Sequence, residues 1–330
     1  MRTRFTDMFD LKTPIASAPM AGAAGGRLAA AVSAAGGLGF VGGGYGDADW
    51  LEWELEEAAK AAPEGPGVGV GFITWSLQKK PALLDMALAH RPRAVFLSFG
   101  DLRPFAPRIA AAGVPLIAQV QDMEQARAAV DDGAEVIVAQ GAEAGGHGAI
   151  RGGMTLVPEI ADLLAARAPD TVLLAAGGIA DGRGLAAALC LGADGALVGS
   201  RFWAAAEALV PQGFHDAALD ADGDATLRTR AVDRARGLRW PGGYTIRVMR
   251  STFTDRWHDD PEGLEKALPR EAPLWQAAFA AGDAAIANPI VGEAVGLIHR
   301  VRPAADIIED MTTGARAALS RAADAAGAGR

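Results

Sequence analysis

The sequence predicts a (β/α)8 TIM barrel, an α/β fold in which parallel strands form the wall and helices surround it. Eight short apolar runs between residues 15 and 198 are bounded by Gly or Pro and do not alternate with polar residues. Such runs are typical of buried parallel strands. Helix-compatible segments separate them, so strand and helix signals alternate along the chain. An open doubly wound sheet is the alternative, because one miscounted strand would separate the two folds.

The predicted elements follow one another as repeated β–α units. The eight predicted strands are residues 15–18, 38–41, 68–73, 94–97, 116–120, 136–139, 172–176 and 196–198. The predicted helices are residues 27–35, 50–61, 81–90, 104–112, 123–131, 155–167 and 182–191. Asp122 and Asp181 directly precede two of these helices. An aspartate at this position accepts hydrogen bonds from the first helical N–H groups, which supports both helix starts.

The pattern changes after about residue 207. Residues 207–300 show no strand periodicity and are rich in Arg, Asp, Ala and Trp, and residues 306–323 have a helical pattern. We therefore expect the barrel to occupy residues 1–206. We expect residues 207–303, called the cover below, to form a smaller, mostly helical subdomain. Residues 304–330 are expected to contribute a C-terminal helix that packs back on the barrel.

Composition narrows the class of partner. The chain has 330 residues, half of them hydrophobic, and a formal net charge of −9, which argues against nucleic acid and anionic membranes. A single cysteine, Cys190, excludes an internal disulfide, and its place within a predicted helix indicates a small buried side chain. The sequence contains no leader-like segment and no uninterrupted apolar run of about 18 residues. We expect a cytoplasmic protein that binds small molecules, with a homodimer possible.

Two glycine-rich loops predict a phosphate site. In a barrel of this kind, the loops after the seventh and eighth strands commonly hold a phosphate. Here those loops contain Gly177 and Gly178, then Gly199 and Ser200, whose N–H groups are sterically open. The alternative is that these glycines only make tight turns. The sequence GLGFVG at residues 37–42 matches a dinucleotide motif by letter, but its central residues form a predicted strand, so we interpret it as a chance match.

Three segments carry a family resemblance. They are APMAG after the first strand, AQGAEAGGHG after the sixth, and AAGGIADGRGLAAALCLGADGALVGSRF across the last two. Together they resemble the nitronate monooxygenases, formerly called 2-nitropropane dioxygenases, closely over residues 10–205 and loosely beyond. The AQGxEAGGHxG pattern is the most specific part. The TIM-barrel type of flavin-dependent enoyl-acyl carrier protein reductase is similar at the same loops, so the pattern indicates fold and flavin better than reaction.

The resemblance implies non-covalent FMN in a TIM barrel, and oxidation of nitronates or nitroalkanes by O2 to carbonyl compounds and nitrite. A family member often presents an asparagine after the third strand, where this chain has Gly71, Phe72, Ile73 and Thr74. Whether a backbone group or Thr74 substitutes for it is open. The implied cofactor-binding residues are Ala18, Pro19, Met20, Ala21, Gln140, Gly145, Gly177, Gly178, Leu197, Val198, Gly199 and Ser200.

His147 is the candidate catalytic residue. It is the one histidine of five that follows a predicted strand, and its neighbours Gly145, Gly146 and Gly148 leave space around the imidazole. An imidazole titrates near pH 6.5, which suits proton transfer. The family resemblance implies that it acts as the base or as a hydrogen-bond donor to the nitro group. The alternative is a histidine that only holds the loop. No histidine spacing indicates a metal site.

Other readings stay open at this point. Glu143 could be a second acid or base, although pairing with a group such as Arg151 is the more common use of a loop glutamate. An NAD(P)H-dependent enoyl-acyl carrier protein reductase would need a nucleotide site, and six arginines between residues 228 and 247 leave room for one. A barrel that binds flavin or another phosphate ligand without turnover is the third possibility.

Overall fold

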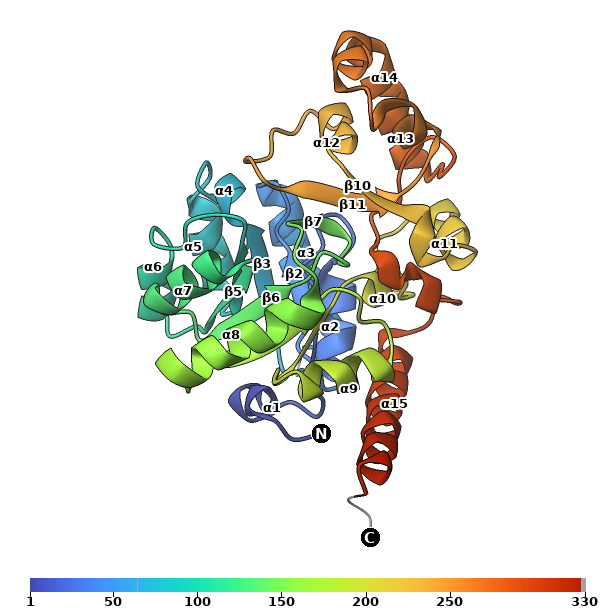
Figure 1. The fold of residues 1–330 in the computed structure, drawn as a ribbon. Helices are drawn as coiled ribbons and strands as arrows, with labels where there is room; N and C mark the ends of the chain where they lie inside the picture. The colour runs from blue at the N-terminus through green and yellow to red at the C-terminus, as the bar shows by residue number, and fades with distance from the viewer. Residues whose placement is uncertain (64, 328–330) are drawn as a thin grey trace.

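A computed structural model describes residues 1–63 and 65–327, and its centre is a parallel barrel (Figure 1). Eight strands are hydrogen-bonded in the order β1-β9-β8-β6-β5-β4-β3-β2. A parallel bridge between Ala16 of β1 and Leu38, two residues before β2, closes the wall. The predicted (β/α)8 fold is therefore confirmed. The strands are β1 Ile15–Ser17, β2 Phe40–Gly42, β3 Gly69–Ile73, β4 Val95–Ser98, β5 Leu116–Val120, β6 Val136–Gln140, β8 Val172–Ala176 and β9 Gly195–Val198.

Helices surround the wall. Asp122 accepts a hydrogen bond from the N–H of Gln125, and Asp181 accepts from Arg183 and Gly184, so both predicted caps are present. The helices around the barrel are α2 Gly26–Ala34, α3 Ala48–Ala61, α5 Ala82–Ala89, α6 Ala106–Ala111, α7 Met123–Asp131, α8 Gly153–Arg167 and α9 Gly182–Cys190, with the short α4 Thr74–Leu77 and α10 Ser200–Trp203 at strand ends. Cys190 is exposed at the end of α9, so the expectation of a buried cysteine is wrong.

Side chains of the N-terminal helix fill the end of the barrel where the strands begin. The N-terminal helix α1, Arg4–Phe9, places Phe5 and Phe9 in the same buried cluster as the inward-facing side chains of the wall. Within the wall, Phe40 and Phe96 meet edge to face with ring centroids 5.6 Å apart. Aromatic side chains of this size fill a barrel interior and leave no channel. The opposite end, where the strands terminate, is left for a binding site.

The cover contains a sheet that the sequence does not reveal. Strand β10, Thr226–Thr229, pairs antiparallel with β11, Thr245–Met249, and β11 pairs with β7, Gly146–Gly148, from the loop after β6. The expectation of no strands in residues 207–300 is therefore wrong. Both strands are short and carry arginines among their apolar residues, and one partner is a glycine-rich barrel loop, so no strand pattern stands out. Figure 1 shows this small sheet directly above the barrel.

The rest of the cover is helical, and the chain then returns to the barrel. The last helix, α15 Ala304–Ala325, packs against α9 and α2 on the outside of the barrel. No helix within residues 1–63 and 65–327 is long and apolar enough to cross a membrane. The cover elements are α11 Gln212–Leu219, α12 Ala231–Ala235, α13 Thr252–Trp257, α14 Pro261–Ala281 and the 3-10 turns Gly223–Ala225 and Glu293–Leu297.

Candidate active site

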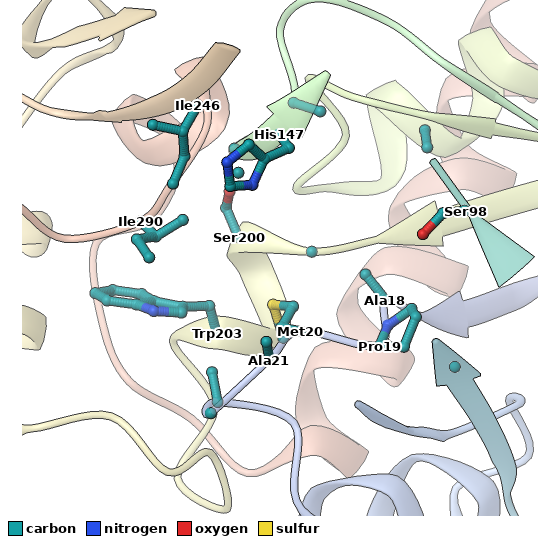
Figure 2. A pocket seen from close by; sticks show the side chains of 18 of the residues that line it. Ala18, Pro19, Met20, Ala21, Ser98, His147, Ser200, Trp203, Ile246 and Ile290 are labelled. Atoms are coloured by element: carbon teal, nitrogen blue, oxygen red, sulfur yellow. The ribbon is translucent and has the colours of Figure 1, made fainter. Parts of the chain in front are cut away.

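A pocket lies between the carboxyl ends of the barrel strands and the cover (Figure 2). Figure 2 shows His147 across the pocket from Met20, with Trp203 and Ile290 at its side. Pockets for small molecules are lined mainly by apolar and aromatic side chains, and the lining here is of that kind. The sequence-predicted residues in the lining are Ala18, Pro19, Met20, Ala21, Gln140, Gly145, His147, Gly177, Gly178, Leu197, Gly199 and Ser200.

Val198 is the exception among the expected cofactor residues. It lies in β9 opposite Ser17 and packs into the cluster formed with α2, α9 and α15. Successive side chains of a strand point to opposite faces, so Leu197 faces the barrel interior and Val198 faces the helices. The side chain of Val198 is therefore not part of the pocket wall.

The glycine loops after β8 and β9 present open backbone donors. Gly177 and Gly178 have φ angles of +101° and +71°, a conformation that favours glycine. The backbone N–H groups of Gly178, Gly199 and Ser200 donate to no acceptor among the residues that the structure describes. The Ser200 hydroxyl accepts a hydrogen bond from the N–H of Gly292 at 2.8 Å. This edge of the pocket can therefore donate several hydrogen bonds to an anionic group.

The loop after β6 is fastened to the cover. Arg228 donates to the carbonyl oxygens of Ala142 and Ala144 at 3.1 and 3.3 Å, and Arg247 also donates to Ala142 at 3.1 Å. Burial lowers the pKa of Arg228 to about 10, so it stays cationic at neutral pH. These two arginines hold the loop, so they do not form the nucleotide cradle that the sequence left open.

Gly145 is required by close packing. A Cβ atom at this position would lie 2.4 Å from the carbonyl carbon of Val291 and 2.5 Å from the nitrogen of Gly292. Both of those groups are backbone and cannot move like a side chain. The glycine therefore lets the cover segment around Val291 approach the pocket wall.

Glu143 has a structural partner. Both of its carboxylate oxygens accept from the N–H of Gly153, at 3.0 and 3.1 Å, at the start of α8. Arg151 pairs instead with Glu159 at 2.6 Å, so the suggested Glu143–Arg151 pair is wrong. A carboxylate interacts favourably with the N–H groups at a helix start. Glu143 therefore holds the loop, although its side chain borders the pocket.

His147 forms a buried pair with Asp233, a residue that sequence reasoning missed. Its Nε2 lies 3.0 and 2.9 Å from the two carboxylate oxygens of Asp233, which belongs to α12 in the cover. A carboxylate only accepts hydrogen bonds, so Nε2 carries the proton and donates it. The lone pair of the neutral ring is then on Nδ1. Strand pairing of His147 with Ile246 fixes the backbone that carries the imidazole.

The surroundings keep the imidazole neutral. Burial lowers the pKa of His147 below its ordinary value of about 6.5. Asp233 opposes this by stabilising the protonated ring, while Arg236 and Arg228 lower the pKa further by repulsion. At neutral pH the ring can therefore accept a proton at Nδ1.

Aromatic residues cover the imidazole. The indole of Trp240 stacks on His147 with centroids 3.4 Å apart and planes within 10°, and its N–H donates to the Tyr45 hydroxyl at 3.2 Å. Phe99 meets the Trp240 ring edge to face at 5.0 Å. The sequence pattern did not single out Trp240 among the seven tryptophans of the chain. Here it limits how the His147 ring can rotate.

An amide cluster marks another edge of the pocket. The Oε1 of Gln140 accepts from the side-chain amides of Gln119 and Gln121 at 3.2 and 2.9 Å, and its Nε2 donates to the His147 carbonyl at 3.1 Å. Gln119 and Ser98 also line the pocket and were missed by sequence reasoning. Both lie in the last residues of their strands, which was the available signal.

The segment after β3 departs from the expected family pattern. Gly71, Phe72 and Ile73 line the pocket, but Thr74 does not. The Thr74 hydroxyl is buried and forms no hydrogen bond with any residue in the described part of the chain. Thr74 therefore does not take the place of the family's asparagine. Ser98, at the end of the neighbouring strand β4, also lines the pocket, and its hydroxyl donates to the Phe72 carbonyl at 3.3 Å.

Comparison with known proteins identifies the family to which a barrel with this pocket belongs. The family described as nitronate monooxygenase matches residues 2–314. A protein of Metarhizium robertsii named nitronate monooxygenase npaC is 37% identical, over 94% of this chain and 93% of its own. The structure of FabK from Thermotoga maritima has a TM-score of 0.83 and 28% identity, covering 97% of this chain and 98% of its own.

A nitroalkane oxidase from Streptomyces ansochromogenes has a TM-score of 0.80 and 26% identity, covering 96% of this chain and 99% of its own. The family match spans both the barrel and the cover, up to the middle of α15. The match therefore includes every element that contributes to the pocket. This chain belongs to the nitronate monooxygenase family.

Proposed function

We propose that this protein oxidises nitronates or nitroalkanes with O2 to carbonyl compounds and nitrite, with FMN as its cofactor. The observation that carries the proposal is the buried His147–Asp233 pair beside the pocket of a barrel from this family. A neutral imidazole, oriented by a carboxylate next to a cavity, is suited to take a proton from a carbon acid. The apolar lining suits a small organic substrate.

The residues present fit a flavin mononucleotide. Ala18, Pro19 and Met20 offer a small, apolar surface for a flat ring. Gln140 and Gln119 offer amides for polar ring atoms, and the open N–H groups of Gly178, Gly199 and Ser200 suit a phosphate. FMN would supply the electron acceptor and the reaction with O2.

His147 would handle the proton. With Nε2 donating to Asp233, the Nδ1 lone pair would take the α-proton of a neutral nitroalkane. A nitronate has already lost this proton, so for that substrate His147 would donate a hydrogen bond to a nitro oxygen only below the lowered pKa of its ring, where Nδ1 also carries a proton. Asp233 would stabilise the protonated ring and keep its orientation. Only 8% of His147 is exposed, so bulk water has little access to the ring.

The decisive experiment combines flavin release and nitrite formation. Denatured, purified protein should release FMN, and the native protein should form nitrite from 1-nitropropane or its nitronate under air. His147→Gln should keep FMN and lose nitrite formation from the neutral nitroalkane. A colourless native protein that releases no flavin on denaturation would refute the proposal, and so would nitrite formation that is unaffected by the substitution.

The reductase and the non-catalytic barrel are less well supported. A reductase needs a site for NAD(P)H, but Arg228 and Arg247 bind the loop after β6, and Arg234 pairs with Glu265 at 3.7 Å. Rapid bleaching of the flavin by NADH without O2 would favour the reductase. The His147–Asp233 pair argues against a barrel without turnover. A cytoplasmic location and a homodimer stay predictions from the sequence.

A further inference from the structure

We propose that Arg236 recognises the negative charge of the substrate and makes the site selective for the ionised nitronate over the neutral nitroalkane. The inference rests on the proposed function. Arg236 directly follows α12, three positions after Asp233, and it lines the pocket with His147 and Tyr45. Among the pocket-lining residues in the described part of the chain, it is the one arginine or lysine.

The guanidinium of Arg236 is held in place and keeps donors to spare. Its Nη1 lies 3.7 Å from Asp233 Oδ1, which is longer than a hydrogen bond. Its central carbon lies 5.1 Å from the centroid of the Tyr45 ring, a cation–π contact. The side chain is 19% exposed, so the charge is partly removed from water. Asp233 accepts its hydrogen bond from His147 Nε2, at 2.9 Å, rather than from Arg236.

This geometry suits an anion with two oxygens. A nitronate spreads its charge over the two oxygens of a planar group, as a carboxylate does. A guanidinium can donate two parallel N–H bonds to such a pair of oxygens, and the bonds are strengthened by the opposite charges. A neutral nitro group has the same oxygens without the net charge, so it gains less from the contact.

Arg236 also offsets a repulsion. The Glu143 carboxylate lines the pocket, and the Asp233 carboxylate is hydrogen-bonded to the pocket-lining His147. Glu143 is already bound to the start of α8. Without Arg236, an entering anion would meet the charge of Asp233 in surroundings of low dielectric constant, where repulsion is strong. A neutral substrate would meet no such penalty.

The test compares the two forms of one substrate. Initial rates of nitrite release are measured with preformed propyl-1-nitronate and with neutral 1-nitropropane, at a pH where His147 is neutral in every variant. Arg236→Gln should lower the ratio of kcat/KM for nitronate to that for nitroalkane about 10- to 100-fold. Arg236→Lys keeps the positive charge but lacks the two parallel N–H donors of a guanidinium, so its ratio should lie between those of the native protein and Arg236→Gln. An unchanged ratio in Arg236→Gln would overturn the inference.

The matched control is Arg230→Gln. Arg230 is exposed at the other end of α12, so this change alters the net charge equally without touching the pocket. Its selectivity ratio should equal that of the native protein. An equal loss of selectivity in both variants would show that the overall charge, rather than Arg236, attracts the anion.

A binding measurement decides the matter without turnover. Butanoate has the shape and charge of propyl-1-nitronate and cannot react. Calorimetric titration of the flavin-loaded protein should show binding that weakens about 10- to 100-fold in Arg236→Gln and is unchanged in Arg230→Gln. If the native protein forms no nitrite, the proposed function fails, yet butanoate binding still tests Arg236. Absence of butanoate binding to the native protein would refute the role of Arg236.

Discussion

The barrel and the cover contribute to the pocket in different ways. The barrel loops contribute mainly glycines and small side chains, such as Gly178 and Ala18, whose value lies in open backbone groups and flat surfaces. The cover contributes the larger side chains of Arg236 and Trp240 to the lining, and its Asp233 is hydrogen-bonded to the pocket-lining His147. The difference predicts a division of work in which the barrel would hold the proposed cofactor and the cover would tune the substrate chemistry.

Replacement of His147, which lies where the barrel and the cover meet, should have the largest effect on activity. His147→Gln should lower nitrite formation from neutral 1-nitropropane about 10²- to 10⁴-fold, because the proton acceptor is lost. The rate with the preformed nitronate should fall far less, because that substrate needs no proton removal. Steady-state nitrite assays with both substrates, alongside the FMN content per chain, check this. Loss of FMN together with both activities would mean that His147 only holds the loop.

Replacement of Asp233 tests whether the cover controls the proton transfer at His147. Asp233→Asn should lower kcat/KM for 1-nitropropane by at least about 10- to 100-fold, because the imidazole loses the carboxylate that orients it and stabilises its protonated form. Asp233 raises the pKa of His147 against the larger effect of burial, so its removal should also shift the acidic limb of the pH profile to lower pH. The exposed Asp220→Asn serves as control. An unshifted acidic limb would separate Asp233 from the titration of His147.

Gly145 tests whether the barrel loop works through its backbone. Gly145→Ala should lower the free energy of unfolding by about 1 to 3 kcal/mol, because the new Cβ has backbone atoms on one side that cannot yield. Gly152→Ala is a matched control, since its Cβ would lie 3.7 Å from the nearest atom, a Glu143 oxygen. Urea unfolding measures both, and equal stabilities would contradict the close packing.

The smallest effect is a dependence of stability on pH. Above about pH 6.5, His147 is neutral in the folded and the unfolded chain and has no effect. Below it, the unfolded chain binds a proton that the folded protein resists, because burial lowers the pKa of His147. The free energy of unfolding should fall in that window, by less than about 1.4 kcal/mol per pH unit. His147→Gln should remove this contribution, and an identical pH slope in the two proteins would contradict it.

The sequence predicted the barrel well and the cover poorly for physical reasons. Each barrel strand is a buried apolar run of its own, so its signal is local. Strand β11 instead has its apolar residues among arginines, and it pairs with a three-residue strand from the loop after β6. Asp233 lies 86 residues from His147 in the chain, so no local spacing links them. The loops showed where a site would be, but not which cover side chains complete it.

The pairing of β7 with β11 has a consequence for engineering and for divergence within the family. Strand β7, which carries His147, is an outer strand of the sheet in the cover. The position of the imidazole therefore depends on the cover as well as on the barrel. The two parts are therefore not interchangeable modules. A cover grafted from a relative would have to be transferred together with residues 141–148, the loop to which Arg228 and Arg247 of the cover bind. Changes in substrate range are more readily reached by single substitutions on α12 and the Trp240 segment than by exchange of whole covers.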